Sequence, residues 1–418
     1  MTRVVITGMG AIAPNGNGLT AFVENSLAGQ VGIKKITKFD AEETGIAVAG
    51  QIDDFDPAEV VGKKNARRMD LYSQYAIQTA QEAVDMAGIN EDNTAPEDMG
   101  VIFGSGIGGL TTIQEQIIKM HDKGPKRVSP MFVPMAISNM AAGNIAIRFN
   151  AQNMCSAVVT ACASGTNAIG DAYRQVKEGR AQVMITGGSE ASVNEIGIAG
   201  FAALTALSTT EDPLKASKPF DVDRNGFVLG EGGAAMVLES LEHAKARGAK
   251  ILGEIVGYGA TGDAYHITSP DPTGKGAARA MQQAIDEAGI TPAEVAYVNA
   301  HGTATHANDS GEAHAIQTVF GEGSEVKVSS TKGMTGHLLG AAGAIEAVLT
   351  VAALEQGKLP ANVGCDNQDP DCPVTLVTAE NQAAPQARFA ISNSFGFGGH
   401  NAVLTFKKWE DAVSYTHL

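Results

Sequence analysis

The sequence has few aromatic residues and few cysteines. Aromatic residues make up 5% of its 418 residues, and it has four cysteines. So few cysteines do not build a disulfide framework, which excludes a small secreted scaffold. Six residues separate Cys155 from Cys162, and six separate Cys365 from Cys372, whereas zinc ligands usually have about two to four between them. We therefore expect no metal site.

Positive charge is also scarce in this chain. Lysine and arginine together number 30, against 46 aspartate and glutamate residues, which gives a net charge of −16. A general nucleic-acid binder needs a basic surface to neutralise phosphates. The charge balance therefore predicts no nucleic-acid partner.

Long apolar runs are absent as well. No run reaches the ~18 residues that a membrane span needs. The least charged long stretch, residues 337–354, contains Glu346 and several glycines and alanines, which favours a buried helix of a soluble protein. The first residues, MTRVVITGMG, enter a strand pattern directly, without a signal peptide. We expect no membrane insertion and a cytoplasmic location.

What the sequence does contain is an alternation of two patterns along the whole chain. Apolar runs rich in β-branched residues, such as RVVITG, MGVIFGSG and QVMITGG, alternate with stretches of helical spacing. This alternation predicts a layered α/β fold. VVTACASGTNAIGDA and VSSTKGMTGHLLGAAGAIEAV both run from a strand through a small polar turn into a helix. They suggest two related halves that divide near residue 250, followed after Lys408 by a tail that we expect to fray.

A glycine pattern near the start resembles a nucleotide-binding motif but lacks its context. GMGAIA, at residues 8–13, matches the dinucleotide fingerprint, which requires a helix to open at those glycines. Pro14 and Gly16 would break such a helix. We therefore expect no nucleotide cofactor.

Cys162 occupies a junction that can activate a thiol. Val158, Val159 and Thr160 suit a short buried strand, and a helical pattern follows that Gly179 would end. A cysteine near a helix N-terminus lies beside free N–H groups and the positive end of the dipole, which favour the thiolate. The pattern fits either a nucleophile or a buried structural cysteine, and this stretch alone does not decide between them.

Two histidines and a glycine-rich loop are further candidates for chemistry. His301 follows a strand in YVNAHGTATH, and His337 begins an apolar helix whose one charged residue is Glu346. A carboxylate on such a helix is costly to bury alone, and Lys332 is the nearest cation in sequence. The loop NSFGFGGHN lies between two strands, so it is either a plain hairpin or a mobile cover with N–H groups facing a reacting oxygen.

Seven stretches taken together resemble one enzyme family. TACASG, GGSEAS, ALST, PFDVDRNGFVLGEG, VNAHGTAT, SSTKGMTGHLLGAAG and SNSFGFGGHN follow the order found in the β-ketoacyl-acyl-carrier-protein synthases, most closely type II, and span nearly the whole chain. The resemblance implies a thiolase-like αβαβα fold of two pseudo-duplicated halves. Residues 1–250 would carry the nucleophile, residues 251–408 the two histidines, and residues 409–418 would be a tail.

The same resemblance implies a reaction, the elongation step of fatty acid biosynthesis. Cys162 would take an acyl chain from an acyl carrier protein as a thioester. A malonyl carrier protein would then lose carbon dioxide, and its enolate would attack that thioester to give a 3-oxoacyl carrier protein. His301 and His337 would donate hydrogen bonds to the enolate oxygen, for which both imidazoles should be neutral.

Further roles follow from the resemblance alone. Lys332 would pair with Glu346 and hold the His337 loop, and the N–H groups of Cys162 and Phe397 would form an oxyanion hole. No cofactor is implied beyond the 4′-phosphopantetheine that the substrates carry, and a homodimer is expected. The implied substrate-binding residues are Thr303 and Thr305 for the pantetheine arm, Ile107 and Phe201 for the acyl pocket, Phe395 as a further contact, and Phe397 as a gate.

Docking of an acidic carrier protein requires local positive charge despite the acidic total. The stretches KKNARR and KGPKR supply two basic clusters, with a solvated surface of no special function as the alternative. The residues predicted to dock the carrier are Lys63, Lys64, Arg67, Arg68, Lys126 and Arg127.

Three positions depart from the usual family pattern. His306 stands where proline is expected, His400 where threonine is frequent, and Lys218 where arginine is frequent. None is a catalytic residue of the motifs, so we expect the chemistry to be intact, while the departures leave carrier contacts and chain-length preference open.

Other enzymes and binding proteins of the same fold are the competing interpretations. A thiolase would have a second catalytic cysteine in the C-terminal glycine-rich loop, which has none here, and a type III synthase would use an asparagine in place of the second histidine. A non-catalytic partner subunit would lack the nucleophile, whereas Cys162 is present. A polyketide synthase would share the chemistry but would usually bring companion domains.

Overall fold

The core of the molecule is a mixed β-sheet whose strands form two sets of the same design. The computed structural model describes residues 2–410, so residues 411–418 of the predicted tail lie outside the described residues. One set runs in the order β6-β5-β7-β8-β1 and the other in the order β11-β10-β13-β14-β9. The first set comprises β1 (Val4–Ala13), β5 (Met99–Gly104), β6 (Cys155–Val158), β7 (Val183–Glu190) and β8 (Gly232–Ser240); the second comprises β9 (Gly253–Gly262), β10 (Val295–Asn299), β11 (Lys327–Ser329), β13 (Phe389–Gly396) and β14 (His400–Lys408).

Strand directions also agree between the two sets. β5 pairs in parallel with β6 and β7, and β8 is antiparallel to β7 and β1. In the same way β10 pairs in parallel with β11 and β13, and β14 is antiparallel to β13 and β9. The sets meet where residues 4–6 of β1 pair with residues 253–255 of β9. The fold class predicted from the sequence, two related α/β halves, is therefore confirmed.

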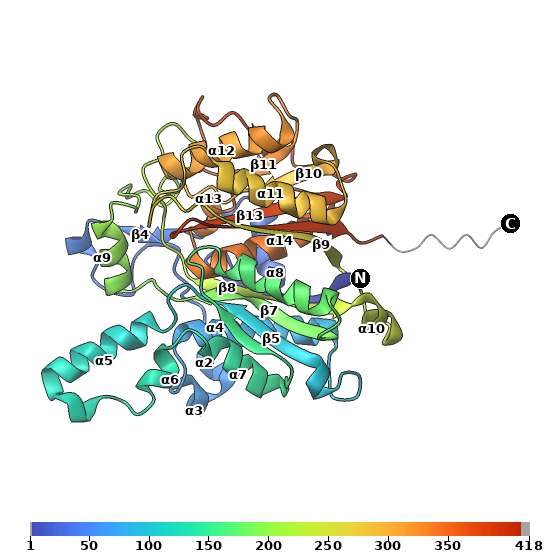
Figure 1. The fold of residues 1–418 in the computed structure, drawn as a ribbon. Coiled ribbons are helices and arrows are strands. Elements are labelled where there is room, and N and C mark those ends of the chain that lie inside the picture. Colours follow the sequence, from blue (N-terminus) through green and yellow to red (C-terminus); the bar gives the residue numbers. More distant parts are fainter. Residues whose placement is uncertain (1, 411–418) are drawn as a thin grey trace.

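Helices separate and cover the two sets of strands to give five layers (Figure 1). The helices α8 (Ser164–Lys177) and α14 (Ala342–Gln356) lie between the sets, and their apolar residues join one core with both. The helices α4 (Leu71–Ala87) and α7 (Met140–Phe149) cover the outer face of the first set. The helices α11 (Lys275–Ala288) and α12 (His306–Phe320) cover the outer face of the second. This is the αβαβα arrangement that the sequence predicts.

The central helix α14 is buried from residue 342 to residue 354, which agrees with its largely apolar sequence. Residues 339–356 form a stretch of mean hydropathy 1.3 that is long enough to cross a membrane by length and composition, but 89% of it is buried inside the molecule. A core helix of a soluble protein passes the same test, so this stretch is weak evidence for a membrane span. The burial agrees with the predicted buried helix.

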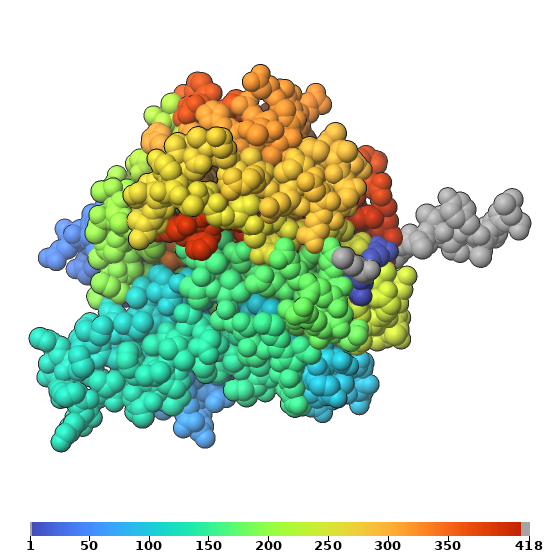
Figure 2. Space-filling view, in the orientation of Figure 1, coloured from blue at the N-terminus to red at the C-terminus, as the bar shows by residue number. Residues whose placement is uncertain are grey.

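Shorter elements lie around these layers, and Figure 2 shows how the chain covers the surface. Surface coloured yellow to orange lies above surface coloured green to teal, and a red patch from near the chain's end emerges between them. The remaining helices are α1 (Leu19–Leu27), α2 (Pro57–Val61), α3 (Lys63–Ala66), α5 (Leu110–Lys123), α6 (Phe132–Ala136), α9 (Glu195–Ala203), α10 (Leu241–Ala246) and α13 (Lys332–Thr335), with short 3-10 turns η1 (Glu42–Thr44), η2 (Pro96–Asp98), η3 (Pro125–Arg127), η4 (Pro292–Glu294) and η5 (Leu339–Ala341). The short strands are β2 (Gly16–Asn17), β3 (Lys34–Lys35), β4 (Val48–Ala49) and β12 (Thr375–Leu376).

Two local predictions differ from the structure. The strand before the cysteine is β6, which ends at Val158 and lies at one edge of the sheet, so that Val159 is 54% exposed rather than buried. Periodicity does not distinguish an edge strand from a central one when the run is short. At the tail, Trp409 packs near Val5 and Leu241. The first residues after Lys408 are therefore held by the fold.

Candidate active site

Cys162 lies in the turn between β6 and α8, as the sequence predicts. Ala161 before it has a φ of 50°, a left-handed conformation that is uncommon without glycine. Ser164, the first residue of α8, stabilises this turn: its Oγ donates to the carbonyl of Ala161 at 2.6 Å and accepts the N–H of Thr160 at 2.9 Å. The strained backbone is thus held by hydrogen bonds, and it places the thiol at the start of the helix.

The two candidate histidines converge on this thiol from the other half of the chain. His301 follows β10, and His337 lies between α13 and η5. One ring nitrogen of each histidine and Sγ of Cys162 all lie within 4.8 Å of one another. The two imidazole centroids are 5.3 Å apart, with the rings nearly perpendicular at 84°. Three side chains distant in sequence therefore share one site.

Both imidazoles are held in their neutral form. Burial lowers the pKa of His301 and of His337 well below the usual value, and the nearby charge of Lys332 lowers both further. A neutral imidazole carries one N–H, which it can donate to an oxygen that gains negative charge. The neutral state that the sequence analysis requires for an enolate-stabilising pair is the state that this environment produces.

The ionisation of the thiol differs from the prediction made for a helix N-terminus. Burial, helped by the charge of Glu190, raises the pKa of Cys162 to about 12, against the opposing effects of Lys332 and of the backbone N–H groups. Cys162 packs among the apolar side chains of Phe227, Leu339 and their neighbours, so the cost of burying a thiolate exceeds the help of the helix. The resting group is a thiol, which becomes reactive as its proton leaves.

Backbone N–H groups converge on the sulfur. The N–H groups of Phe397 and of Cys162 itself both interact with the Cys162 sulfur. Gly396 makes this possible, because a Cβ there would lie 2.7 Å from the carbonyl oxygen of Thr160 and 3.1 Å from the Cys162 nitrogen. The hairpin between β13 and β14 therefore approaches the nucleophile closely, and it presents the pair of donors that an oxyanion hole needs.

Lys332 and Glu346 form a buried ion pair beneath the histidines. Each side chain is 1% exposed, and Nζ of Lys332 donates to Oε1 of Glu346. Burial raises the pKa of Glu346 to about 7 against the opposing charge of Lys332. Lys332 opens α13 and Glu346 lies in α14, so the pair connects the two helices on either side of His337.

A cavity of about 90 Å³ surrounds the three converging groups. Thr303 and Thr305 lie on its wall with their hydroxyl oxygens 3.0 Å apart, and the ring of Phe395 meets that of His301 edge-on at 5.8 Å. The residues that line the cavity are Cys162, Phe201, Ala206, Phe227, Asp263, Thr268, Pro270, His301, Thr303, Thr305, Asn308, His337, Leu339, Phe395, Gly396, Phe397 and Asn401.

Ile107 lies behind this wall. It packs with Phe201 and Cys162 against an apolar cluster, which we call the thiol-side cluster, but it does not line the cavity itself. The buried members of the thiol-side cluster are Ile46, Ala49, Val193, Ile198, Leu207, Phe227, Leu229 and Leu339. An acyl chain attached to the sulfur can extend toward this cluster.

Two buried carboxylates that the sequence motifs do not reveal support the site. Glu312 in α12 accepts the N–H groups of His301 and Gly302, both at 2.8 Å, and so fixes the turn after β10. Glu190 accepts hydrogen bonds from the loop before α5 and from the turn after His337. The one available signal was a lone acidic residue within an apolar motif, such as GGSEAS.

One thiol and two imidazoles, the groups that converge in this site, are also ligand types that zinc prefers. A histidine bound to zinc usually donates its second ring N–H to a carboxylate or carbonyl oxygen. Nδ1 of His301 and Nδ1 of His337 are both buried without a hydrogen-bond partner in residues 2–410. The donor set therefore fits a substrate oxygen better than a metal ion.

The basic residues predicted to dock a carrier protein lie on the surface. Lys63, Lys64, Arg67 and Arg68 are exposed in and after α3, and Lys126 and Arg127 are exposed in η3 beyond the tip of α5. Both elements lie on the side of the first set of strands (Figure 1). Among the described residues, none of these side chains forms an ion pair within 4.0 Å.

The three departures from the family pattern lie around the cavity rather than at its reacting groups. His306 is exposed at the start of α12, one residue after Thr305. His400 begins β14 after the Gly396–Gly399 turn, and Lys218 is half-buried near Phe220. None of the three lines the cavity.

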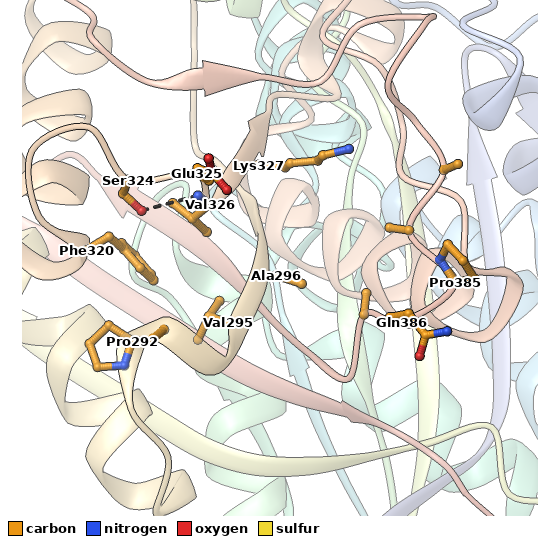
Figure 3. Close-up of a pocket in the computed structure, with 14 residues that line it drawn as sticks. Pro292, Val295, Ala296, Phe320, Ser324, Glu325, Val326, Lys327, Pro385 and Gln386 are labelled. Carbon is orange, nitrogen blue, oxygen red and sulfur yellow. Dashed lines mark hydrogen bonds between the residues drawn. The ribbon is translucent and has the colours of Figure 1, made fainter.

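Another hollow, of about 660 Å³, lies elsewhere in the second half (Figure 3). Its walls are the start of β10, the end of α12, the segment before β11 and the loop at residues 383–387. Phe320, Val295 and Val326 give it a largely apolar lining. None of the predicted site residues lines it, so the chemistry belongs to the smaller cavity.

Comparison with known proteins places this arrangement in a family. The family model of the β-ketoacyl synthase N-terminal domain matches residues 1–244, and that of the β-ketoacyl synthase C-terminal domain matches residues 252–366. The chain belongs to the β-ketoacyl synthase family. The resemblance of the motifs is thereby confirmed, while the division at residue 250 stays a prediction.

This β-ketoacyl synthase aligns with named relatives over nearly its whole length. It is 51% identical to a 3-oxoacyl-(acyl-carrier-protein) synthase 2 of Staphylococcus aureus (strain N315), over 98% of this chain and 99% of the relative. It is 48% identical to a protein of the same name from Synechocystis sp., over 98% of each chain.

Solved structures agree with this assignment. The ishigamide ketosynthase/chain length factor superposes with a TM-score of 0.92 at 34% identity, covering 98% of this chain and 100% of that one. A type II polyketide ketosynthase in complex with its acyl-carrier protein superposes with a TM-score of 0.90 at 31% identity, covering 98% and 100%. The thiolase-like fold predicted for this β-ketoacyl synthase is thus confirmed.

Proposed function

We propose that this β-ketoacyl synthase is a 3-oxoacyl-acyl-carrier-protein synthase of type II that elongates fatty acids. It condenses an acyl carrier protein thioester with malonyl carrier protein, releases carbon dioxide and forms a 3-oxoacyl carrier protein. The observation that carries this proposal is the convergence of Cys162, His301 and His337 within 4.8 Å of one another. Identity of 51% to a 3-oxoacyl-(acyl-carrier-protein) synthase 2 favours fatty acid elongation over polyketide extension, for which the structural relatives are 31–34% identical.

The first half-reaction transfers the acyl chain to the cysteine. The Cys162 sulfur attacks the thioester carbonyl, and the thiol proton leaves with the departing pantetheine sulfur. Negative charge develops on the carbonyl oxygen, where the N–H groups of Cys162 and Phe397 stabilise it. The acyl chain then extends toward Phe201 and the thiol-side cluster, so apolar contacts help to hold the intermediate.

The second half-reaction forms the carbon–carbon bond. The malonyl thioester loses its carboxylate as carbon dioxide, and the bonding electrons pass to an enolate whose oxygen lies near His301 and His337. Their neutral rings donate N–H groups to that oxygen. The enolate carbon attacks the acyl thioester, and the Cys162 sulfur departs as a thiolate, which takes up one proton from water and so returns to the resting thiol.

Substrate arms and carrier protein contact the outer parts of the site. Thr303 and Thr305 donate hydrogen bonds to the pantetheine arm, and Phe397 in the glycine-rich turn gates access to the sulfur, with Phe395 behind it. The exposed clusters at residues 63–68 and 126–127 dock the acidic carrier protein, which agrees with their lack of ion-pair partners among the described residues. The reaction balances without a metal or a further cofactor.

The enzyme acts as a homodimer in the cytoplasm. Support for the dimer comes from β6, an edge strand whose backbone is unpaired on one side. Exposed apolar side chains surround it: Ile147 at 79%, Val159 at 54% and Met154 at 44%. Ile147→Lys should convert a dimer into a monomer in size-exclusion chromatography with light scattering, and a wild-type monomer would contradict this part of the proposal.

The decisive experiment is an elongation assay with malonyl carrier protein and acyl carrier proteins of graded chain length. The wild-type enzyme should form 3-oxoacyl carrier protein and release one carbon dioxide for each product. Cys162→Ala is the matched control, because it removes one sulfur atom and should abolish elongation while the protein stays folded. Elongation by the alanine variant, or none by the wild type, would contradict the proposal.

A further inference from the structure

Glu190 is a buried carboxylate in the centre of the molecule that supports the site without lining its cavity. It is the last residue of β7 and is fully buried, at 0% exposure. Within residues 2–410, no lysine, arginine or histidine forms an ion pair with it. A buried carboxylate without a cation is costly unless hydrogen bonds replace its hydration.

Four donors satisfy this carboxylate, two on each oxygen. Oε2 accepts the N–H of Gly106 at 2.7 Å and the N–H of Gly340 at 3.0 Å. Oε1 accepts the N–H of Ile107 at 3.2 Å and the hydroxyl of Ser105 at 3.2 Å. Every donor is a backbone N–H or a short hydroxyl, so the carboxylate holds backbone in place.

The two backbone segments come from different halves and face different substrates. Ser105, Gly106 and Ile107 form the loop after β5, and Ile107 packs beside Cys162 in the thiol-side cluster. Gly340 lies in η5, three residues after His337, and its neighbour Leu339 lines the cavity. One carboxylate thus connects two segments. The first is the loop of Ile107, toward which an acyl chain would extend, and the second is the turn that follows His337.

Close packing leaves no room for another arrangement. A Cβ on Gly340 would lie 2.2 Å from the Gly106 nitrogen and 2.8 Å from Oε2 of Glu190, and one on Gly106 would also lie 2.8 Å from that oxygen. Leu339 has a φ of 46°, a conformation that needs support from its surroundings. Glu190 provides that support one residue away.

We propose that Glu190 is a positioning residue that fixes the loop of Ile107 and the turn after His337 in register, and so sets the preference among acyl chain lengths. The proposal rests on the proposed function and deepens it. Glu190 does not touch the reacting atoms. It acts through Ile107 on the acyl chain and through Gly340 on His337.

Glu190→Gln separates these two connections. Glutamine keeps the shape but replaces one acceptor oxygen by an NH₂ group, which cannot accept a backbone N–H. If NH₂ took the place of Oε2, the N–H groups of Gly106 and Gly340 would both lose their acceptor. If it took the place of Oε1, the N–H of Ile107 and the hydroxyl proton of Ser105 would lose their acceptor, but the Ser105 oxygen, which already accepts the N–H of Gly108, could also accept a hydrogen bond from the new NH₂ group. The second orientation is favoured. The loop that contains Ile107 should therefore become more mobile, while the turn after His337 keeps its position.

The test compares acyl transfer to Cys162 from long-chain and short-chain carrier proteins, and measures malonyl decarboxylation separately. For Glu190→Gln, the ratio of long-chain to short-chain kcat/KM should fall about tenfold, the effect of losing roughly one buried hydrogen bond. Malonyl decarboxylation should stay within about threefold of wild type. Glu190→Ala, which releases both segments, should lower both quantities.

Glu239→Gln is the matched control. Glu239 is also a fully buried carboxylate on the neighbouring strand β8, but it binds Thr7, His243 and Arg247 away from the cavity. Its substitution should lower the melting temperature without changing the chain-length ratio. An unchanged or higher ratio in Glu190→Gln, or an equal fall in Glu239→Gln, overturns the proposal.

Two further measurements keep the test interpretable. If Glu190→Gln does not fold, Ser105→Ala removes one donor to Glu190, together with the acceptor of the Gly108 N–H, and should shift the same ratio in the same direction by a smaller factor; no shift overturns the proposal. If the wild-type enzyme forms no acyl-Cys162 with any carrier protein, the proposed function itself is wrong. If the wild type forms it but the chain-length ratio is the same in the variant, only the role proposed for Glu190 is wrong.

Discussion

At the scale of single residues, burial decides the ionisation of the groups in the cavity. It lowers the pKa of His301 and His337 and raises the pKa of Cys162 to about 12. All three groups are therefore uncharged at neutral pH. Negative charge first appears on the substrate oxygens, where preorganised N–H donors already point.

The reactivity of Cys162 tests this ionisation. Alkylation by a neutral reagent proceeds through the thiolate. With a pKa of about 12, the rate constant for Cys162 should rise about tenfold for each pH unit from 7 to 9, without a plateau. Tandem mass spectrometry, in which fragment ions between Cys155 and Cys162 locate the alkyl group, separates this reaction from that of the exposed Cys155. A plateau below pH 8 would show that the helix N-terminus outweighs burial.

The Lys332–Glu346 pair gives a prediction about stability. Lys332→Met leaves Glu346 buried without its cation, which should cost about 3–5 kcal/mol in the free energy of unfolding at pH 8. The double variant Lys332→Met with Glu346→Leu should recover much of this loss, because no unpaired charge is left. Urea denaturation measures both changes.

An exposed pair serves as the control for that experiment. Lys250 and Glu355 form an ion pair with side chains 75% and 40% exposed. Lys250→Met should change the free energy of unfolding by about 1 kcal/mol or less. A loss for Lys332→Met as small as this would contradict the structural role of the buried pair.

At the scale of elements, the sequence predicts the helices and turns of the site better than its strands. The helix after Cys162 begins at Ser164 and ends before Gly179, as its apolar spacing and that glycine indicate. The apolar helix around Glu346 is α14. The sequence places the strand before Cys162 too late, because three β-branched residues fit an edge strand and the turn after it equally well.

The hairpin between β13 and β14 gives the prediction for this scale. In Gly396→Ala, the new Cβ would lie 2.7 Å from the Thr160 carbonyl oxygen and would push the turn, with the Phe397 N–H, away from the sulfur. Loss of one oxyanion donor should slow acyl transfer by roughly 10²–10³-fold. Single-turnover transfer from an acyl carrier protein measures it.

Gly262→Ala is the control in the paired strand. Gly262 lies opposite His400 in the neighbouring β9, and a Cβ there would meet no atom within 4 Å. This variant should transfer acyl chains at close to the wild-type rate. Equal rates for the two variants would show that the turn does not contribute to the oxyanion hole.

At the scale of the whole molecule, the site exists because two related halves pack face to face. The motifs, read together, predicted which residues meet, but no pattern of spacing gave the distances between Cys162, His301 and His337. Glu190 and Glu312 could not be assigned from the sequence, because their role is to accept backbone N–H groups. Such contacts depend on tertiary packing and leave no periodic signal.

The distribution of charge over the molecule gives a kinetic prediction. The net charge is −16, yet residues 63–68 form an exposed basic cluster. Reversing Arg67 and Arg68 to glutamate should raise KM for carrier-protein substrates about tenfold or more and leave kcat unchanged, because the residues steer docking and do not touch the chemistry. The effect should shrink as salt is added.

A charge-matched variant is the control for docking. Lys245→Glu with Lys358→Glu changes the net charge equally at exposed positions in α10 and after α14. Its KM should stay near the wild-type value. Unchanged kinetics of the Arg67 and Arg68 variant at physiological salt would contradict carrier docking at this cluster.

The most direct test of the account is intact-protein mass spectrometry combined with carbon dioxide release in a single turnover. The wild-type enzyme and a variant with His301→Ala and His337→Ala are each mixed with an acyl carrier protein and then with malonyl carrier protein. Both proteins should gain the acyl mass on Cys162, but the wild type alone should release carbon dioxide and lose the adduct as product forms. A wild type without the adduct would contradict the role of the Cys162 sulfur in acyl transfer. A double variant that releases carbon dioxide at the wild-type rate would contradict the role of the two imidazoles in decarboxylation.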